Sequence, residues 1–204
     1  LNCITISCVQ LRLLVYILIL EKERRYVPMK LMQYISHIRE GGTNIKKAKK
    51  NGMIVGKNFH CAPSVFIDPA HCFLISIGDD CTFTAKVHIL AHDASIKRHL
   101  GYTKIGKVSI GNRVFLGVGT VILPGVMIGD DVIVGAGSVV TKSIPPREVW
   151  AGSPAKKICS LEEYLAKHSG KQHFGKDYYL SSNLSEGKKN EIRQAVENGT
   201  AYIV

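Results

Sequence analysis

An apolar residue returns at every sixth position over most of residues 55–140, and this spacing is the most regular feature of the chain. Two insertions divide the repeats, and the last stretch keeps its register for five successive intervals. A helix buries one face with a period of about 3.6 residues and a half-buried strand alternates with a period of about two, so neither element explains the spacing. The repeating positions are Val55, Cys61, Ile67, Ile77, Phe83, Ile89, Ile110, Leu116, Ile122, Ile128, Val134 and Val140.

Other positions of the six-residue unit are patterned as well. Glycine often follows the apolar residue, Asp79, Asn112 and Asp130 come next in three units, and a small or β-branched residue stands four positions after the apolar one. We interpret each unit as one short strand and a corner, in which Gly, Asn and Asp tolerate the turn geometry. Stacked coils of this kind share one continuous core. The pattern therefore predicts a mainly β protein, a single-stranded parallel β-helix whose handedness the spacing does not give.

The repeats divide the chain into four segments. Residues 1–28 form an apolar leader that we expect to be non-native or dispensable; a membrane anchor is the alternative, although Gln10 and Arg12 interrupt a run shorter than the roughly 20 residues that a spanning helix needs. Residues 29–52 predict a short amphipathic helix over 30–40 and a basic linker. The β-helix covers 53–158 with a protruding loop at 92–107, and 159–204 predict a helix that begins near Ser160, followed by a tail.

Charge and cysteine content narrow the function classes. The net charge of +11 and the pI near 9.4 indicate a surface that attracts phosphates and other anions. We expect no nucleic-acid partner, because the sequence has neither an arginine-rich run nor a nucleic-acid-binding motif. The six cysteines form no Cys-x-x-Cys pair and no zinc-binding spacing, which suits a reducing cytoplasm and indicates no structural metal. Membrane contact is not expected.

The segment IGNRVFLGVGTVILPGVMIGDDVIVGAGSVVTKSIPPREVWAGSPAKKI, residues 110–158, resembles the hexapeptide-repeat acetyltransferases of the galactoside, maltose and capsular-polysaccharide type. The resemblance covers roughly residues 50–160, about half of the chain. It implies a left-handed β-helix, an exception to the usual right-handed crossover. It further implies a homotrimer with active sites between neighbouring subunits, acetyl-CoA as the donor and no metal.

The resemblance places a catalytic base at the start of the loop that leaves the β-helix, where His92 stands in this sequence. Transfer of an acetyl group from a thioester to a hydroxyl needs a base for the hydroxyl proton, and histidine has a suitable ordinary pKa. A neighbouring carboxylate or carbonyl would fix its tautomer, but the sequence does not say which. His99, deeper in the loop, is the reserve candidate, and His60 and Asp68 are candidate acceptor contacts.

The resemblance also assigns donor contacts to six positions. Val118 and Ala136 match small residues whose backbone meets the pantetheine arm, and the other matches lie near the acyl group or the phosphates. Cys159 departs from the family, because galactoside acetyltransferases carry an arginine there. The remaining donor candidates are Phe115, Thr141, Lys142 and Lys156.

These observations predict an acetyl-CoA-dependent O-acetyltransferase with a sugar or glycan acceptor. The HDAS loop resembles acyltransferases of surface-polysaccharide synthesis, so a polysaccharide or glycan precursor is favoured. The alternatives are an N-acetyltransferase on an amino sugar or other small acceptor, and a non-catalytic scaffold. A further alternative is a γ-carbonic-anhydrase-like zinc enzyme, with His88, His92 and either His60 or His71 as ligands.

Overall fold

The computed structural model describes residues 42–171, 173–179 and 183–204. The predicted leader over 1–28 and the predicted amphipathic helix over 30–40 lie outside the described residues. The chain divides into two compact units, the first ending at Leu161 and the second comprising Glu162–Val204. Among the described residues, no helix combines the length and the apolar character needed to cross a membrane.

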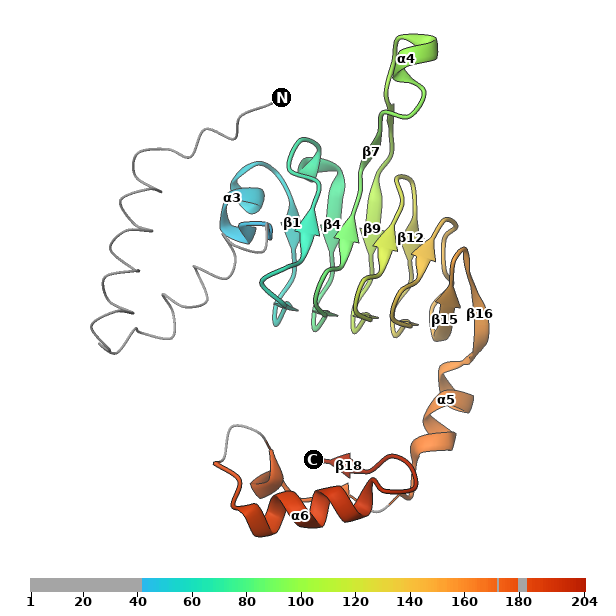
Figure 1. The fold of residues 1–204 in the computed structure, drawn as a ribbon. Coiled ribbons are helices and arrows are strands. Elements are labelled where there is room, and N and C mark those ends of the chain that lie inside the picture. Colours follow the sequence, from blue (N-terminus) through green and yellow to red (C-terminus); the bar gives the residue numbers. More distant parts are fainter. Residues whose placement is uncertain (1–41, 172, 180–182) are drawn as a thin grey trace, which may run out of the picture. The chain divides into compact units, whose positions relative to one another are not determined.

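Short strands, parallel except where the last two of the second sheet pair with each other, wind into three sheets in the first unit (Figure 1). The predicted β-helix is confirmed, and the sheets stack as in a left-handed β-helix. The first sheet contains β1 (Ile54–Val55), β4 (Ile75–Ile77), β9 (Val108–Ile110) and β12 (Met127–Ile128). The second contains β2 (His60–Cys61), β5 (Thr82–Phe83), β10 (Phe115–Leu116), β13 (Ile133–Val134), β15 (Glu148–Gly152) and β16 (Ala155–Ser160). The third contains β3 (Phe66–Ile67), β6 (His88–Ile89), β11 (Val121–Ile122) and β14 (Val139–Val140).

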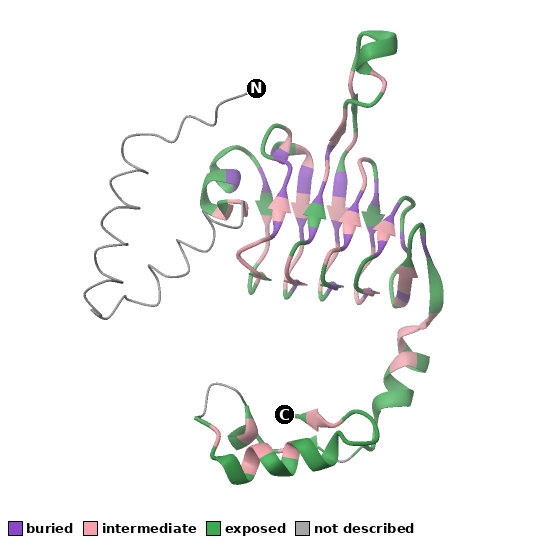
Figure 2. Ribbon diagram, in the orientation of Figure 1, coloured by how far each residue is buried: buried purple, intermediate pink, exposed green. Residues whose placement is uncertain are grey.

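The predicted core lies inside this coil (Figure 2). From Ile67 onward, every predicted inward position of the six-residue pattern is buried, and so are the small residues four positions later, including Thr120 and Ser138. Burial of one such aliphatic or aromatic side chain contributes about 1.5–3 kcal/mol. Val55 and Cys61, which belong to the first coil, are only half-buried.

A hydrogen-bond ladder joins successive coils at one corner. The Asn112 side-chain oxygen accepts the Asp79 backbone N–H at 2.8 Å, and the Asp130 carboxylate accepts the Asn112 N–H at 2.8 Å. The positive backbone dihedral of the turn falls on the following residues, with φ of 53° at Arg113 and 57° at Asp131. The predicted role of Asn and Asp in tolerating the turn is therefore wrong for these positions, where the side chains instead satisfy the backbone of the neighbouring coil.

The glycines that directly follow the apolar repeat positions serve close packing rather than the turn. A Cβ on Gly111 would lie 2.3 Å from the Asp130 carboxylate oxygen and 2.8 Å from its backbone nitrogen. The φ of Gly111 is not in the left-handed region, so the absence of a side chain is needed for the approach of the next coil. The expectation that these glycines are needed for the turn geometry is therefore wrong.

Two insertions leave the regular coils. The first contains the 3-10 turn η1 (Cys72–Leu74). The second is the protruding loop, in which β7 (His92–Asp93) pairs antiparallel with β8 (Lys104–Ile105) and the helix α4 (Lys97–Leu100) forms the tip (Figure 1). Its base is closed where the Gly106 N–H donates to the Ala91 carbonyl at 2.9 Å.

The part predicted as a basic linker contains helix α3 (Ile45–Lys50). Asn44 caps it by accepting the Lys47 N–H, and Ala48 is buried against the core. The helix forms because its cap and one small apolar residue anchor a stretch that is otherwise lysine-rich.

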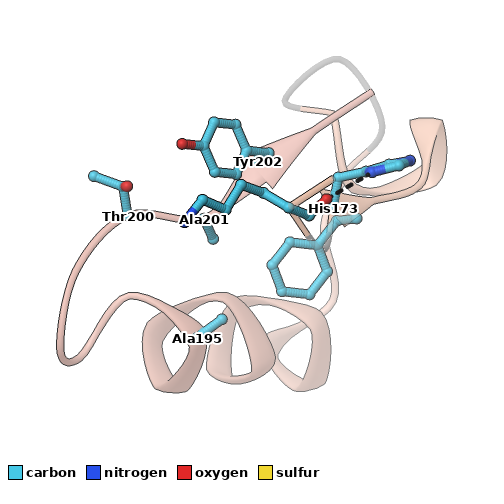
Figure 3. Close-up of a pocket in the computed structure, with 7 residues that line it drawn as sticks. His173, Ala195, Thr200, Ala201 and Tyr202 are labelled. Atoms are coloured by element: carbon cyan, nitrogen blue, oxygen red, sulfur yellow. Dashed lines mark hydrogen bonds between the residues drawn. The ribbon is translucent and has the colours of Figure 1, made fainter. Parts of the chain in front are cut away.

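The second unit follows the β-helix with α5 (Leu161–His168), which corresponds to the helix predicted near Ser160. It continues with β17 (His173–Phe174), η2 (Lys176–Tyr178), α6 (Glu186–Ala195) and β18 (Tyr202–Ile203). The strands β17 and β18 pair in parallel, and a cavity of about 310 Å³ lies beside them (Figure 3). Lys171, His173, Phe174, Ala195, Thr200, Ala201 and Tyr202 line it.

Candidate active site

The candidate site lies where strands of the third sheet end. Strands β3 and β6 are adjacent in this sheet, with Ile67 paired to Ile89. Asp68 directly follows β3, and its N–H donates to the Ile89 carbonyl at 2.9 Å. His92 follows β6 after a short connection and opens the protruding loop. Neighbouring parallel strands that end at one edge therefore bring together two residues that are far apart in sequence.

The Asp68 carboxylate is fully buried and accepts hydrogen bonds on both oxygens. Oδ1 accepts the backbone N–H groups of Ala70 at 3.0 Å and of His71 at 3.3 Å. Oδ2 accepts the Ala91 N–H at 3.1 Å and the Nδ1 of His92. Four donors thus hold one buried carboxylate, which fixes its orientation against the imidazole.

These contacts determine the charge of the carboxylate. Burial acts to raise the pKa of Asp68, but the hydrogen bonds from His92 and from three backbone N–H groups outweigh it and leave the pKa below its ordinary value. An ionised carboxylate only accepts hydrogen bonds, so the Nδ1 of neutral His92 carries the proton. The lone pair of the imidazole is then on Nε2. The His92 side chain is 37% exposed, which leaves it accessible to a reactant.

A second histidine stands beside this pair. The rings of His71 and His92 have centroids 4.8 Å apart, and the His71 Nδ1 lies 3.8 Å from the Asp68 Oδ2. Sequence reasoning named His71 only as an optional third zinc ligand, because nothing in the repeat pattern places it near His92. The contact arises from the insertion after β3, which the six-residue period does not describe.

The other histidine candidates are elsewhere. His60 is exposed on β2 in the second sheet, and His99 is exposed on α4 in the loop. His88 faces outward from β6, where its Nδ1 contacts the Lys86 carbonyl at 2.9 Å and its ring lies against Phe66. Within the described residues, the side chains grouped closely enough to hold a metal are Asp68, His71 and His92, so the alternative zinc set built on His60 or His88 does not assemble.

The predicted donor residues occupy three exposed regions of the β-helix. Val118 and Ala136 stack on successive coils at the corner between the second and third sheets, and the Val118 carbonyl accepts the Gly137 N–H at 2.7 Å. Phe115 is 41% exposed on β10, near that corner. Three more candidates lie apart from it. Thr141 and Lys142 follow the carboxyl end of β14 in the third sheet, the same side of the sheet on which His92 follows β6. Lys156 is exposed on β16.

Comparison with known proteins gives the class. Residues 107–142 match the family described as bacterial transferase hexapeptide (six repeats). Protein CapG of Staphylococcus aureus is 39% identical over 129 residues, which are 58% of this chain and 75% of CapG. Galactoside O-acetyltransferase of Escherichia coli K12 is 32% identical over 133 residues, 64% of this chain and 62% of that enzyme. The solved maltose O-acetyltransferase from Clostridium difficile 630 is 38% identical with a TM-score of 0.47, covering 53% of this chain and 59% of that one.

The chain therefore belongs to the hexapeptide-repeat acetyltransferase superfamily. It spans three quarters of the length of CapG and less than two thirds of the galactoside and maltose enzymes.

Proposed function

We propose that the chain transfers an acetyl group from acetyl-CoA to a hydroxyl group of a sugar, in a polysaccharide or glycan precursor. The observation that supports this best is the His92–Asp68 pair, with a buried anionic carboxylate on Nδ1 and an accessible Nε2. The family membership supports acetyl transfer, and the name of the galactoside O-acetyltransferase describes transfer to an oxygen of a galactoside.

In this mechanism, His92 acts as the general base. Its Nε2 takes the acceptor hydroxyl proton while the oxygen attacks the thioester carbonyl carbon. Asp68 is a positioning residue, because it holds the reactive tautomer and stabilises the imidazolium that forms. The tetrahedral intermediate collapses with cleavage of the carbon–sulfur bond. The imidazolium then returns its proton to the sulfur, so that coenzyme A leaves as the thiol and His92 is regenerated without an acyl-enzyme.

We assign the donor to the exposed corner of Val118 and Ala136, with Phe115 near the acyl group. Thr141, Lys142 and Lys156 meet the phosphates, because lysine pairs well with phosphate oxygens. We further propose a homotrimer, in which the donor corner of one copy faces the His92 of its neighbour. The acceptor contacts His60 and His99 in this arrangement, both of which are exposed.

The test is acetyl-CoA turnover, followed by thiol release, on a panel of sugars and amino sugars with wild type and His92→Ala. We expect kcat to fall by roughly 10²–10⁴-fold while coenzyme A binding is retained, since general-base catalysis contributes about that much. His88→Ala is the matched control, because His88 lies on the same coil but faces outward. Its turnover should equal that of wild type.

The outcomes separate the alternatives. Turnover that survives in His92→Ala would transfer the base role to His99. Acetylation of amino sugars alone would favour the N-acetyltransferase over the O-acetyltransferase. Absence of coenzyme A binding would favour the non-catalytic scaffold.

A further inference from the structure

Three metal-ligating side chains meet at the base of the protruding loop. One ligand atom from each of Asp68, His71 and His92 lies within 4.8 Å of the others. The three come from two adjacent coils, and the backbone of β3 and β6 fixes the distance between those coils. The proposed acetyl transfer uses Asp68 and His92 but assigns no task to His71.

The His71 Nδ1 is the observation that the proposed reaction leaves unexplained. This nitrogen is buried and has no hydrogen-bond partner within the part of the chain that the structure describes. It lies 3.8 Å from the Asp68 Oδ2, too far for a hydrogen bond. Buried polar atoms are normally paired, so an orphaned imidazole nitrogen beside a carboxylate indicates a missing partner at this point.

The donor set and its spacing fit a transition metal. Two imidazole nitrogens and one carboxylate oxygen, with an open fourth position, suit tetrahedral Zn²⁺. Metal–ligand bonds of about 2 Å place tetrahedral ligand atoms about 3.3 Å apart. The His71 Nδ1 would therefore have to approach Asp68 by about half an ångström, and the His92 Nδ1, which is hydrogen-bonded to Asp68, would have to move away from it. Mg²⁺ and Ca²⁺ prefer oxygen ligands, which makes them poor occupants.

We propose that Asp68, His71 and His92 form a binding site for a divalent transition metal of the zinc class, and that its occupation inhibits acetyl transfer. The metal takes the lone pairs of both Nδ1 atoms and one carboxylate oxygen. The single proton of the neutral His92 ring then resides on Nε2, so that nitrogen has no lone pair for the acceptor hydroxyl. Inhibition rests on the proposed function, whereas binding does not.

Binding is measured first, without acetyl-CoA or acceptor. The full chain, stripped of metal by a chelator that is then removed, is titrated with ZnCl₂ by calorimetry. We expect a site with one Zn²⁺ per chain whose affinity falls by at least about tenfold in His71→Ala, because one ligand of three is lost. His88→Ala, an exposed histidine outside the cluster, should bind as wild type does. Co²⁺ should give the visible absorption of a tetrahedral site in wild type and lose it in His71→Ala.

The proposal is overturned if His71→Ala binds Zn²⁺ as tightly as wild type, or if wild type binds none at this stoichiometry. Circular dichroism confirms that each variant is folded, and His71→Gln, which keeps a similar volume, replaces His71→Ala if the latter is not. A second arm adds ZnCl₂ to the turnover assay, where wild type should lose activity over the concentration range in which it binds. If the protein binds zinc but the metal-free protein acetylates no acceptor, the acetyltransferase proposal is refuted and the metal site stands. Turnover that persists at saturating zinc would refute the inhibition.

Discussion

Asp68 is the residue on which the geometry of the candidate site depends. Its carboxylate is fully buried and accepts four hydrogen bonds, of which three come from backbone N–H groups. A carboxylate in such a setting contributes to stability, apart from its proposed role in catalysis, because the folded state holds the charged form more favourably than the unfolded chain does.

The stability contribution of Asp68 should disappear in acid. Its folded pKa is below the ordinary value of about 3.9, so the contribution is present above the unfolded pKa and is lost as pH falls through the folded pKa. We expect Asp68→Asn to cost about 1–3 kcal/mol at pH 7, since an amide leaves one of the buried N–H groups unpaired. Urea unfolding of both proteins between pH 7 and pH 2 measures the difference, which should shrink below about pH 4. A difference that stays constant with pH would contradict this origin.

The kinetic effect of the same substitution is a separate prediction. An asparagine side chain can donate to Nδ1 and stabilise the tautomer with its lone pair on the wrong nitrogen. We expect Asp68→Asn to lower kcat by roughly 10²–10⁴-fold with a smaller change in KM, as in other His–Asp pairs. Steady-state kinetics over a range of pH make the check, with His88→Ala as the control. The expected role of Asp68 as an acceptor contact is wrong, because its carboxylate is fully buried and both oxygens are hydrogen-bonded. A variant that raised KM alone would contradict the positioning role.

The site could be predicted from the sequence only in part. The position of His92 follows from the resemblance and from the insertion after Ile89. Its carboxylate partner does not, because Asp68 and His92 are 24 residues apart and meet only through the register of β3 on β6. That register depends on the length of the first insertion, and the same insertion folds His71 back toward Asp68.

At the level of the elements, each position of the six-residue unit is restricted to residues that fit against the neighbouring coil. The apolar positions fill the interior, the small positions fit the corners, and the glycines allow backbones to approach. The period of six was therefore sufficient to predict the fold and most of the core. It could not predict α3 or the structure inside the predicted loop, where the repeat is interrupted and local caps and pairings decide the structure.

Replacement of a repeat glycine tests this account. Gly111→Ala places a Cβ 2.3 Å from the Asp130 carboxylate and 2.8 Å from its backbone nitrogen, so the coils must separate. We expect a loss of about 1–3 kcal/mol, typical of overpacking. Gly187→Ala is the control, because the nearest atom to its Cβ is 3.8 Å away and the site is in helix α6. It should be neutral or stabilising by about 0.5–1 kcal/mol in chemical denaturation. Equal effects at both positions would remove the close-packing argument.

At the scale of the whole molecule, the chain carries a net charge of +11. The candidate phosphate contacts Lys142 and Lys156 are both exposed, so water and salt reach them. A positive surface of this kind raises the local concentration of anions and loses that effect as salt screens it. In the proposed mechanism, charge therefore bears on how the donor is captured and not on how the acetyl group is transferred.

This separation predicts a salt effect on KM alone. Raising ionic strength from about 50 to 500 mM shortens the screening length from roughly 14 to 4 Å, and we expect KM for acetyl-CoA to rise several-fold while kcat stays constant. Lys142→Ala and Lys156→Ala should raise KM at low salt and flatten its salt dependence. Lys46→Ala, which replaces an exposed lysine on α3 ahead of the first coil, should do neither if the effect is local. Equal flattening in all three variants would assign donor capture to the overall charge, and a KM that ignores salt would remove lysine–phosphate contacts from the donor site.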